Sequence, residues 1–173
     1  MSQEIEPPAP DSTITVLLEI GRAFGRVPNL FQAYAKYPPL LEANWNKVKA
    51  VLLNGKLRRK AKETAALLVS NDNGCAYCVA AHSAALTSLG TSEAEIAAML
   101  QSGTLPGLSE AEIALVNFAR KVNLHWRDIN EADFKALNAL GVEEEEIVEI
   151  LGVVELFAGF NRFARAMRIA VDF

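Results

Sequence analysis

Residues that end helices divide this chain into short segments, and this division limits the fold more than any other feature of the sequence. Segments with apolar residues at helical spacing are closed by Gly25, the Asn54, Gly55 pair, Gly90, Gly103 and Gly141. A glycine directly after such a segment is typical of a helix C-terminus. No stretch has the strict apolar and polar alternation, bounded by hairpin turns, that indicates a strand. We therefore predict an all-α fold in which antiparallel helical hairpins pack as a bundle.

Several helix starts are marked as clearly as the helix ends. Ser92 with Glu95, and Ser109 with Glu112, have the spacing of a capping box. In this motif each side chain accepts a hydrogen bond from the backbone N–H of the other residue. The last predicted helix starts with the acidic residues 143–146 and ends with basic residues, and both complement the helix dipole. The basic residues are Arg162, Arg165 and Arg168.

The segment from Lys56 to Ser70 is helical by pattern and contains a run of basic residues. We expect its apolar side to face the core and its basic side to face solvent. The basic side consists of Arg58, Arg59, Lys60 and Lys62. Glu63 interrupts this basic surface.

Length and composition indicate one compact domain. The chain has 173 residues, of which 51% are hydrophobic and 22% charged, and this fits a large core or an oligomer that covers apolar surface. We predict a flexible tail over residues 1–10, which are acidic and rich in proline. A single helical domain is predicted over residues 11–173.

Charge and hydropathy argue against several classes of function. The net charge is −4, and the 17 Lys and Arg residues form no dense run, which disfavours nucleic-acid binding. The N-terminal residues lack the basic and apolar segments of a signal peptide, and no apolar run approaches membrane-spanning length. We predict a cytoplasmic protein that makes no membrane contact.

Both cysteines and one of the two histidines lie in the segment GCAYCVAAHSAALTSLG, which we predict to form one helix over about residues 74–89. On this helix Cys75, Cys78 and His82 stand at positions i, i+3 and i+7 and share one face. The face continues through apolar residues and is expected to point toward the core. A CxxC pair in a reducing compartment is more often catalytic or redox-sensing than a structural disulfide.

This arrangement suits thiol chemistry. A free thiol is mostly protonated at neutral pH, so a reactive cysteine needs a neighbouring base or a positive field. His82 lies one turn beyond Cys78 and can supply that base. Side chains three residues apart on a helix have Cβ atoms about 5–6 Å apart, so Cys75 and Cys78 can close a disulfide after a small adjustment. Glu63 can orient the imidazole if its helix packs against the cysteine helix.

Two arguments compete over which cysteine attacks the substrate. Cys75 lies at the positive N-terminal end of the helix and nearer to solvent, which favours it as the nucleophile. Cys78 lies deeper and next to His82, which suits attack on a small substrate in an apolar pocket. We assign Cys78 to the substrate, and Cys75 to resolving the intermediate and reacting with an external dithiol.

The spacing of these residues resembles that of a known family. Glu63, the CxxC pair and His82 are similar to the pattern of the AhpD-like alkylhydroperoxidases of the carboxymuconolactone decarboxylase superfamily. Three segments also resemble this family, most closely its peroxidase-related branch: GCAYCVAAH, LSEAEIALVNFARKV and ALNALGVEEEEIVEILGVVELFAGFNRFARAM. The resemblance covers most of the chain from about Pro28.

The resemblance implies an all-α fold, assembly into trimers or hexamers, and reduction of hydroperoxides without metal or flavin. In the family's best-known form the second cysteine attacks the peroxide, the first resolves the intermediate, and a Glu and a His relay the proton. The matching residues here are Cys78, Cys75, Glu63 and His82. That form has a histidine directly before the second cysteine, where this chain has Tyr77.

Less specific interpretations of the same residues stay open. The two cysteines can be inert core residues, and a single histidine such as His82 is more often a hydrogen-bonded core residue than a catalyst. A zinc site would combine Cys75, Cys78 and His82 with Glu63 as the fourth ligand. Structural zinc sites favour a second, distant Cys or His pair, which this chain lacks. We predict no metal and no cofactor.

The predicted function is thiol-dependent hydroperoxide reduction by a dithiol and disulfide cycle. The expected partners are a hydroperoxide, a thioredoxin-like or lipoyl-bearing dithiol reductant, and further copies of this chain. One alternative is a redox-sensing or disulfide-exchange protein without peroxidase turnover. Another is a decarboxylase or lactonase-type activity of the wider superfamily, which would leave the cysteine pair without a role.

Overall fold

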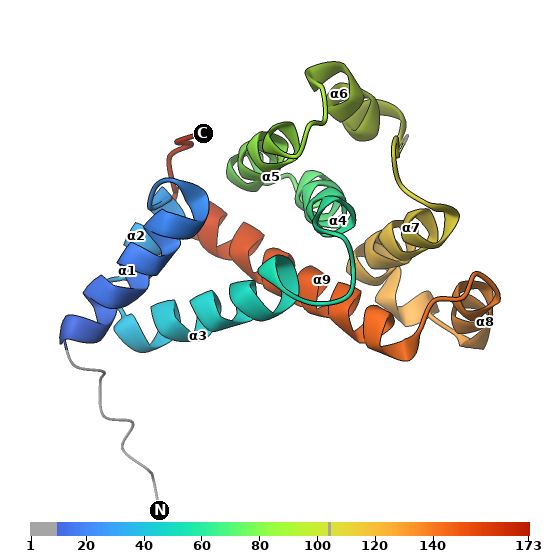
Figure 1. Cartoon of the computed structure of the whole chain (residues 1–173), viewed down its shortest axis with the longest axis horizontal. Helices are drawn as coiled ribbons and strands as arrows, with labels where there is room; N and C mark the ends of the chain where they lie inside the picture. Colours follow the sequence, from blue (N-terminus) through green and yellow to red (C-terminus); the bar gives the residue numbers. More distant parts are fainter. Residues whose placement is uncertain (1–9, 104) are drawn as a thin grey trace, which may run out of the picture.

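A computed structural model describes residues 10–103 and 105–173 of the chain (Figure 1). The tail predicted for residues 1–10 therefore lies outside the described residues, apart from Pro10. Within these two ranges the chain is helical and contains no strand, which confirms the predicted all-α fold. No helix in the described ranges is long and apolar enough to cross a membrane.

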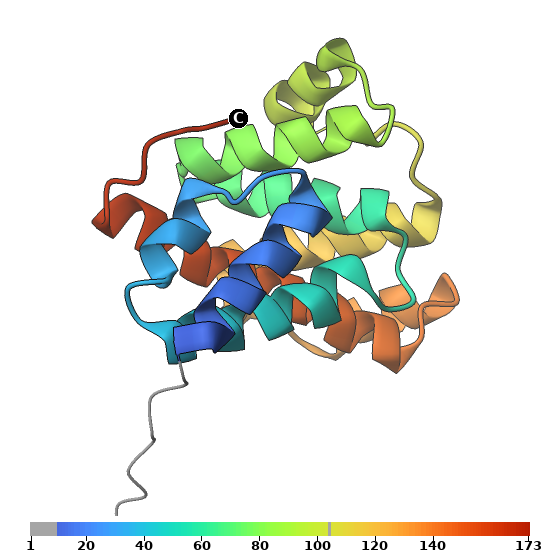
Figure 2. The same ribbon diagram turned by 60° about the vertical axis from the view of Figure 1, so that its left-hand side comes forward.

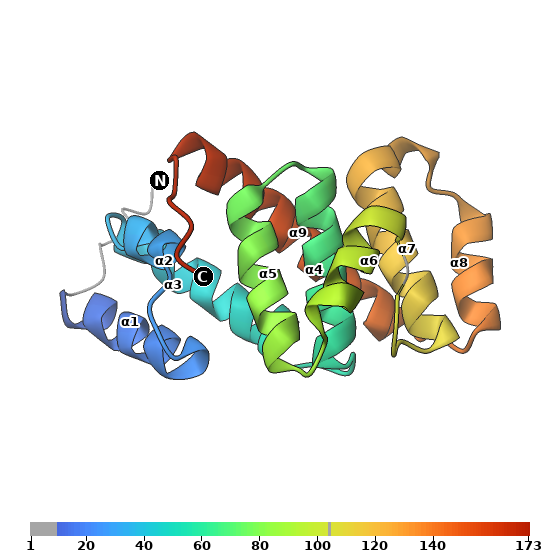
Figure 3. The ribbon, with the colours of Figure 1, turned by 90° about the horizontal axis from the view of Figure 1, so that it is seen from above.

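The helices follow one another with short connections. In chain order they are α1 (Pro10–Phe24), α2 (Asn29–Tyr34), α3 (Pro38–Val48), the π-helical turn η1 (Lys49–Leu53), α4 (Arg59–Asp72), α5 (Ala76–Ser88), α6 (Glu93–Ser102), α7 (Glu110–His125), the 3₁₀ turn η2 (Trp126–Asp128), α8 (Glu131–Ala139) and α9 (Glu144–Ala166). α9 extends along the molecule and contacts α3, α4, α5 and α7 (Figures 1 and 3). It therefore connects the N-terminal helices to the rest of the bundle.

The predicted capping boxes are confirmed. At the start of α6, the backbone N–H of Ser92 donates to the Glu95 carboxylate at 2.8 Å, and the N–H of Glu95 donates back to the Ser92 hydroxyl. The same reciprocal pair opens α7 at Ser109 and Glu112. These contacts satisfy backbone N–H groups that the first turn of a helix leaves without partners.

α4 lies at the centre of the bundle and is buried on every side. Residues 61–70 are all buried, and α5, α7 and α9 pack around them. Since the surrounding helices cover the whole circumference, polar side chains of this segment also lie in the interior. Glu63 is one of them, and the position of this helix brings its carboxylate next to α5.

The prediction that Lys62 faces solvent is wrong. Its side chain is 2% exposed, and its ammonium group donates to the carboxylate of Glu149 on α9 at 2.7 Å and to the backbone carbonyl of Asn54. A buried ammonium group needs such partners because desolvation without them is costly. The pairing joins residues 87 positions apart, which helical periodicity cannot indicate.

Glu149 also holds the loop before α4 against α9. Its carboxylate accepts hydrogen bonds from the backbone N–H groups of Lys56 and Leu57 at 2.8 and 3.2 Å. Gly55 lies directly against this carboxylate, with a φ of +105°, and a Cβ at this position would come within 2.2 Å of Glu149. The close approach explains why the turn needs glycine.

The N-terminal helices close the side of the bundle that bears the site. Figure 2 brings this side forward, with α1 crossing in front of α3 and α5 lying above it. Phe24 and Phe31 pack edge-on against Trp45, and Phe31 makes a further edge contact with Phe160 of α9. These rings form an aromatic wall opposite α5.

The buried pair of Lys62 and Glu149 yields a prediction about stability. We expect Lys62→Met to lower the free energy of unfolding by about 3 kcal/mol, because it leaves the Glu149 charge buried without its partner. Urea unfolding monitored by circular dichroism measures the loss. The double variant Lys62→Met/Glu149→Gln removes both charges and is expected to be more stable than the single one.

Lys47→Met is a control, because its ion pair with Glu155 is exposed and should contribute less than about 1 kcal/mol. Equal losses for Lys47→Met and Lys62→Met would contradict the importance of the buried pair.

Candidate active site

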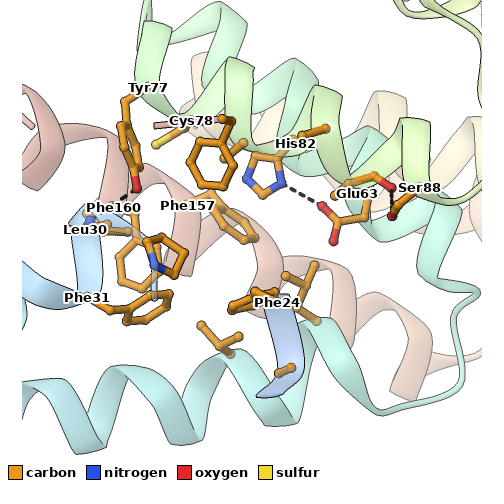
Figure 4. Close-up of a pocket in the computed structure, with 18 of the residues that line it drawn as sticks. Phe24, Leu30, Phe31, Glu63, Tyr77, Cys78, His82, Ser88, Phe157 and Phe160 are labelled. Carbon is orange, nitrogen blue, oxygen red and sulfur yellow. Dashed lines mark hydrogen bonds and ion pairs between the residues drawn. The ribbon is translucent and has the colours of Figure 1, made fainter. Parts of the chain in front are cut away.

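α4 and α5 meet at a buried hydrogen bond between two of the predicted site residues. His82 Nδ1 lies 2.7 Å from Glu63 Oε2, and the side chains are 5% and 1% exposed. With Nδ1–H donating to the carboxylate, the other ring nitrogen, Nε2, points away from Glu63 on the side of Cys78 (Figure 4). The structure thus brings Glu63 and His82 together across two helices.

Arg59 is a third member of this group, and the sequence analysis missed it. Its Nε and Nη2 lie 2.6 and 2.5 Å from Glu63 Oε1, so Arg59 and His82 occupy the two carboxylate oxygens separately. Arg59 also borders the cavity described below. The prediction of a solvent-facing side chain for it is confirmed only in part, because the side chain is 31% exposed but pairs with Glu63. The i, i+4 spacing to Glu63 was the available signal.

The Glu63 carboxyl stays ionised in this setting. Burial alone would raise its pKa, but the hydrogen bond and charge of His82 and the guanidinium of Arg59 outweigh burial and hold the pKa of Glu63 below its usual value. An ionised Glu63 fixes the Nδ1–H tautomer of a neutral His82 and stabilises the ring when it is protonated.

The cysteine helix begins later than predicted, so that only the second of the two cysteines lies within it. α5 starts at Ala76, and Cys75 is its N-cap residue, with the Cys78 backbone N–H 3.4 Å from the Cys75 sulfur. Both cysteines are buried free thiols. Cys75 therefore lies at the end of the helix and not on the face that carries Cys78 and His82.

The two sulfurs share one proton unequally. A hydrogen bond from the Cys78 thiol, with a smaller contribution from the Cys78 backbone N–H, outweighs burial and lowers the pKa of Cys75 to about 6. The same contact with Cys75, together with burial, raises the pKa of Cys78 far above its usual value. At neutral pH this geometry favours a Cys75 thiolate and a Cys78 thiol.

A cavity of about 650 Å³ opens in front of Cys78 and His82. Its remaining walls are mainly apolar. They include the aromatic residues Phe24, Phe31, Tyr77, Phe157 and Phe160 (Figure 4), and Phe173. Cys78, His82 and Glu63 all border this space, whereas Cys75 does not. A molecule in the cavity therefore meets only one of the two sulfurs.

Tyr77, which stands where the best-known family form has a histidine, points toward α2. Its hydroxyl accepts a hydrogen bond from the Leu30 backbone N–H at 3.2 Å, and its ring packs against Phe173. Burial raises the pKa of Tyr77, so the phenol stays protonated. Tyr77 serves as part of the cavity wall and makes no hydrogen bond to His82 or Glu63 among the described residues.

Cys75 faces a polar group of side chains on α4, α7 and α9. Its backbone N–H donates to the Ser70 carbonyl at 2.9 Å, and the Ser70 hydroxyl accepts from Asn161 Nδ2 at 2.9 Å. Asn73 donates in turn to the Asn161 side-chain oxygen. Asn161 could not be identified from the sequence, because its contacts come from residues 88 and 91 positions away.

The zinc alternative finds no geometric support. In residues 10–103 and 105–173, no group of three or more His, Cys, Asp or Glu side chains is arranged to hold a metal ion. Glu63 and His82 instead bond to each other. The arrangement provides a thiol, an imidazole and a carboxylate around one apolar space.

Comparison with known sequences identifies a relative and a family. The sequence profile described as "Carboxymuconolactone decarboxylase family" matches residues 38–121. An alkyl hydroperoxide reductase of Mycobacterium tuberculosis is 32% identical over 119 residues, which make up 66% of this chain and 34% of that protein. This chain thus spans about a third of the length of that curated relative.

Solved structures with the same fold extend the similarity to nearly the whole chain. A peroxidase-related protein of Silicibacter sp. TM1040 is 27% identical with a TM-score of 0.85, and the match covers 99% of this chain and 95% of that one. A peroxidase-related protein of Ralstonia eutropha JMP134, with an alkylhydroperoxidase AhpD core, has the same identity and TM-score over 99% and 94%. Profile, relative and fold agree: the chain matches the carboxymuconolactone decarboxylase family over residues 38–121, and its fold is that of AhpD-like, peroxidase-related proteins.

Proposed function

We propose that this protein is a thiol-dependent hydroperoxide reductase. The observation that carries the proposal is the placement of Cys78 and the Glu63–His82 pair on one apolar cavity, with Cys75 directly behind Cys78. The relative from Mycobacterium tuberculosis, an alkyl hydroperoxide reductase by name, supports the same activity.

The first step oxidises Cys78. Its thiol proton passes to His82, and the Cys78 thiolate attacks one peroxide oxygen. The S–O bond forms as the O–O bond breaks, so that sulfur is oxidised and the peroxide is reduced. The alkoxide leaves with a proton from His82, which gives an alcohol and a sulfenic acid on Cys78.

The second step closes the disulfide. The Cys75 thiolate attacks the Cys78 sulfur, the S–S bond forms, and the S–O bond breaks. The leaving hydroxide becomes water with a proton that His82 has regained from solvent. The low pKa of Cys75 keeps it ready for this step at neutral pH. An external dithiol then returns two electrons and two protons to the pair.

The cavity favours an organic hydroperoxide of low charge. Two arginines border it, but Arg59 is paired with Glu63 and Arg26 with Asp172, so neither charge is free. Aromatic walls bind an apolar substituent through burial and ring contacts. We therefore place the organic part of the substrate against the aromatic wall and its peroxide group at Cys78.

The remaining family expectations belong to this proposal. The reductant is a thioredoxin-like or lipoyl-bearing dithiol, and the protein assembles into trimers or hexamers in the cytoplasm. No metal or cofactor takes part in the proposed cycle.

A coupled peroxidase assay with cumene hydroperoxide and dithiothreitol tests the proposed cycle. Cys78→Ser is expected to abolish turnover. Cys75→Ser, oxidised without dithiothreitol, should stop after one oxidation, at a sulfenic acid that dimedone traps. His82→Ala and Glu63→Gln are expected to lower kcat by about 10²-fold or more, because general acid–base catalysis contributes this much. His125→Ala is a matched control, since the other histidine is exposed and remote in sequence.

Full turnover by Cys78→Ser would refute the proposal. Rapid oxidation of the pair without repeated turnover, under any dithiol, would favour a redox sensor. Turnover of a lactone substrate by the double Cys→Ser variant would favour the decarboxylase side of the superfamily.

The shared proton of the cysteine pair gives a prediction for pH dependence. Thiolate absorbance at 240 nm should rise with a midpoint near the lowered pKa of Cys75, about 6, and the rate of Cys78 oxidation should fall as the pH drops below this value. Cys75→Ser removes this transition. Cys78→Ala moves it to higher pH, because the side-chain donor to Cys75 is lost. A single midpoint in the ordinary thiol range for the unmodified chain would contradict the shared proton.

Arg59 is proposed as a positioning residue that holds Glu63 and hence His82. Arg59→Gln is expected to lower kcat about tenfold with little change in KM, because a displaced relay slows proton transfer without altering the aromatic wall. Arg59→Lys should restore part of the loss. Arg58→Gln is the matched control, since the neighbouring Arg58 pairs with Glu112. A rise in KM alone would mean that Arg59 acts through substrate binding.

A further inference from the structure

Three arginines near the C-terminal end of α9 stand apart from the other basic residues. Arg162, Arg165 and Arg168 are exposed, and none of them forms an ion pair within the described ranges, whereas most other Lys and Arg residues do. In a chain with a net charge of −4, they form a local excess of positive charge. We call these three residues the basic face.

The basic face borders the turn that carries Cys75. A Cβ placed on Gly74 would lie 4.0 Å from Arg165 Nη1, so the guanidinium lies beside the residue directly before Cys75. Asn73 in the same turn is hydrogen-bonded to Asn161, the neighbour of Arg162. Figure 3 shows the turn between α4 and α5 beside the C-terminal part of α9.

Carboxylates near this turn do not cancel the positive charge. Asp72, the acidic residue closest in sequence to Cys75, is already paired with Arg120 through two hydrogen bonds of 2.7 and 2.8 Å. The other residues of the turn, Asn71, Asn73 and Gly74, are uncharged. The surface beside Cys75 is therefore positive.

The two cysteines thus face different surroundings. Cys78 borders the aromatic cavity, while Cys75 lies outside it and follows two exposed residues, Asn73 and Gly74. A reductant that approaches Cys75 at the turn does not need to enter the space that holds the hydroperoxide. Oxidant and reductant can then reach the disulfide by different routes.

We propose that the basic face docks a protein reductant that carries its dithiol in an acidic surface, and that this reductant attacks Cys75. The proposal rests on the hydroperoxide reductase cycle above. Charge complementarity is the argument for an acidic partner: the chain as a whole repels it, and the three arginines attract and orient it beside Cys75.

The reductive step balances in two exchanges. A thiolate of the partner attacks the Cys75 sulfur, a mixed disulfide forms, and Cys78 leaves as a thiolate that takes a proton from His82. The second thiolate of the partner then attacks the partner's first sulfur, which is bonded to Cys75 in the mixed disulfide. This releases the Cys75 thiolate. The partner ends as a disulfide, and the pair has gained two electrons.

The test measures reduction of the disulfide separately from oxidation by the hydroperoxide, and it uses the full chain. The disulfide form is mixed with a reduced, acidic thioredoxin in a stopped-flow instrument, and the second-order rate constant is measured at low and at physiological ionic strength. We expect Arg165→Glu/Arg168→Glu to lower this constant at least tenfold at low salt, and salt to lower it for the unmodified chain. Arg165→Gln/Arg168→Gln, which removes the charges without reversing them, should show a smaller fall.

Arg22→Glu/Lys135→Glu is the matched control, because it changes the net charge equally on α1 and α8, at the two ends of the molecule (Figure 3). It should leave the rate constant nearly unchanged, and all variants should react equally with dithiothreitol. Equal rates for the basic-face variants and the control would overturn the docking surface. A parallel fall with dithiothreitol would also overturn it, since the arginines would then act on the sulfur itself.

Oxidation of the reduced pair by cumene hydroperoxide is recorded before any reductant is added. Failure at this stage rejects the proposed function. If oxidation is normal but the reduction rate is the same in the unmodified chain and in the basic-face variants, only the docking surface is rejected.

Discussion

The hydrogen bond between Glu63 and His82 is the contact on which the site depends. A carboxylate that is 1% exposed is stable in an ionised form only if charged or polar partners replace water. Here His82 and Arg59 occupy its two oxygens, and each partner comes from a different place: one from α5, the other from the preceding turn of α4. The hydrogen bond forms only if α4 packs closely against α5, and it in turn fixes the orientation of His82 toward the cavity.

The start of α5 decides what each cysteine can do. Had the helix begun at Gly74, Cys75 and Cys78 would share a face and both would border the cavity. Because the first helical residue is Ala76, Cys75 becomes the N-cap, and its sulfur accepts from the Cys78 backbone N–H instead. One sulfur then meets the apolar space, and the other meets the polar side chains of Ser70 and Asn161. This asymmetry lets two nearly adjacent thiols take different roles.

Much of the fold was predictable because its signals are local. The capping boxes at Ser92 and Ser109, and the glycines after the helices, depend on contacts a few residues apart. The grouping of Glu63 with His82 was predictable from the family pattern. The burial of Lys62 was not, because its partner Glu149 is far away in sequence and the basic run around it looks like a solvated helix face. Asn161 and the cavity walls were missed for the same reason: only the packing of α9 and of the N-terminal helices brings them to the cysteines.

Tyr77 shows how the same packing alters a relay. A histidine at this position could exchange protons near Cys78, but a phenol whose pKa is raised by burial, and whose oxygen accepts from the Leu30 backbone, cannot do so at neutral pH. In the proposed cycle proton transfer then passes through His82, because it is the only imidazole among the described residues that border the cavity. Tyr77 therefore replaces a proton-relay group with an aromatic ring, which packs against Phe173 and lines the cavity. A shorter relay and a more apolar cavity are therefore two effects of one residue.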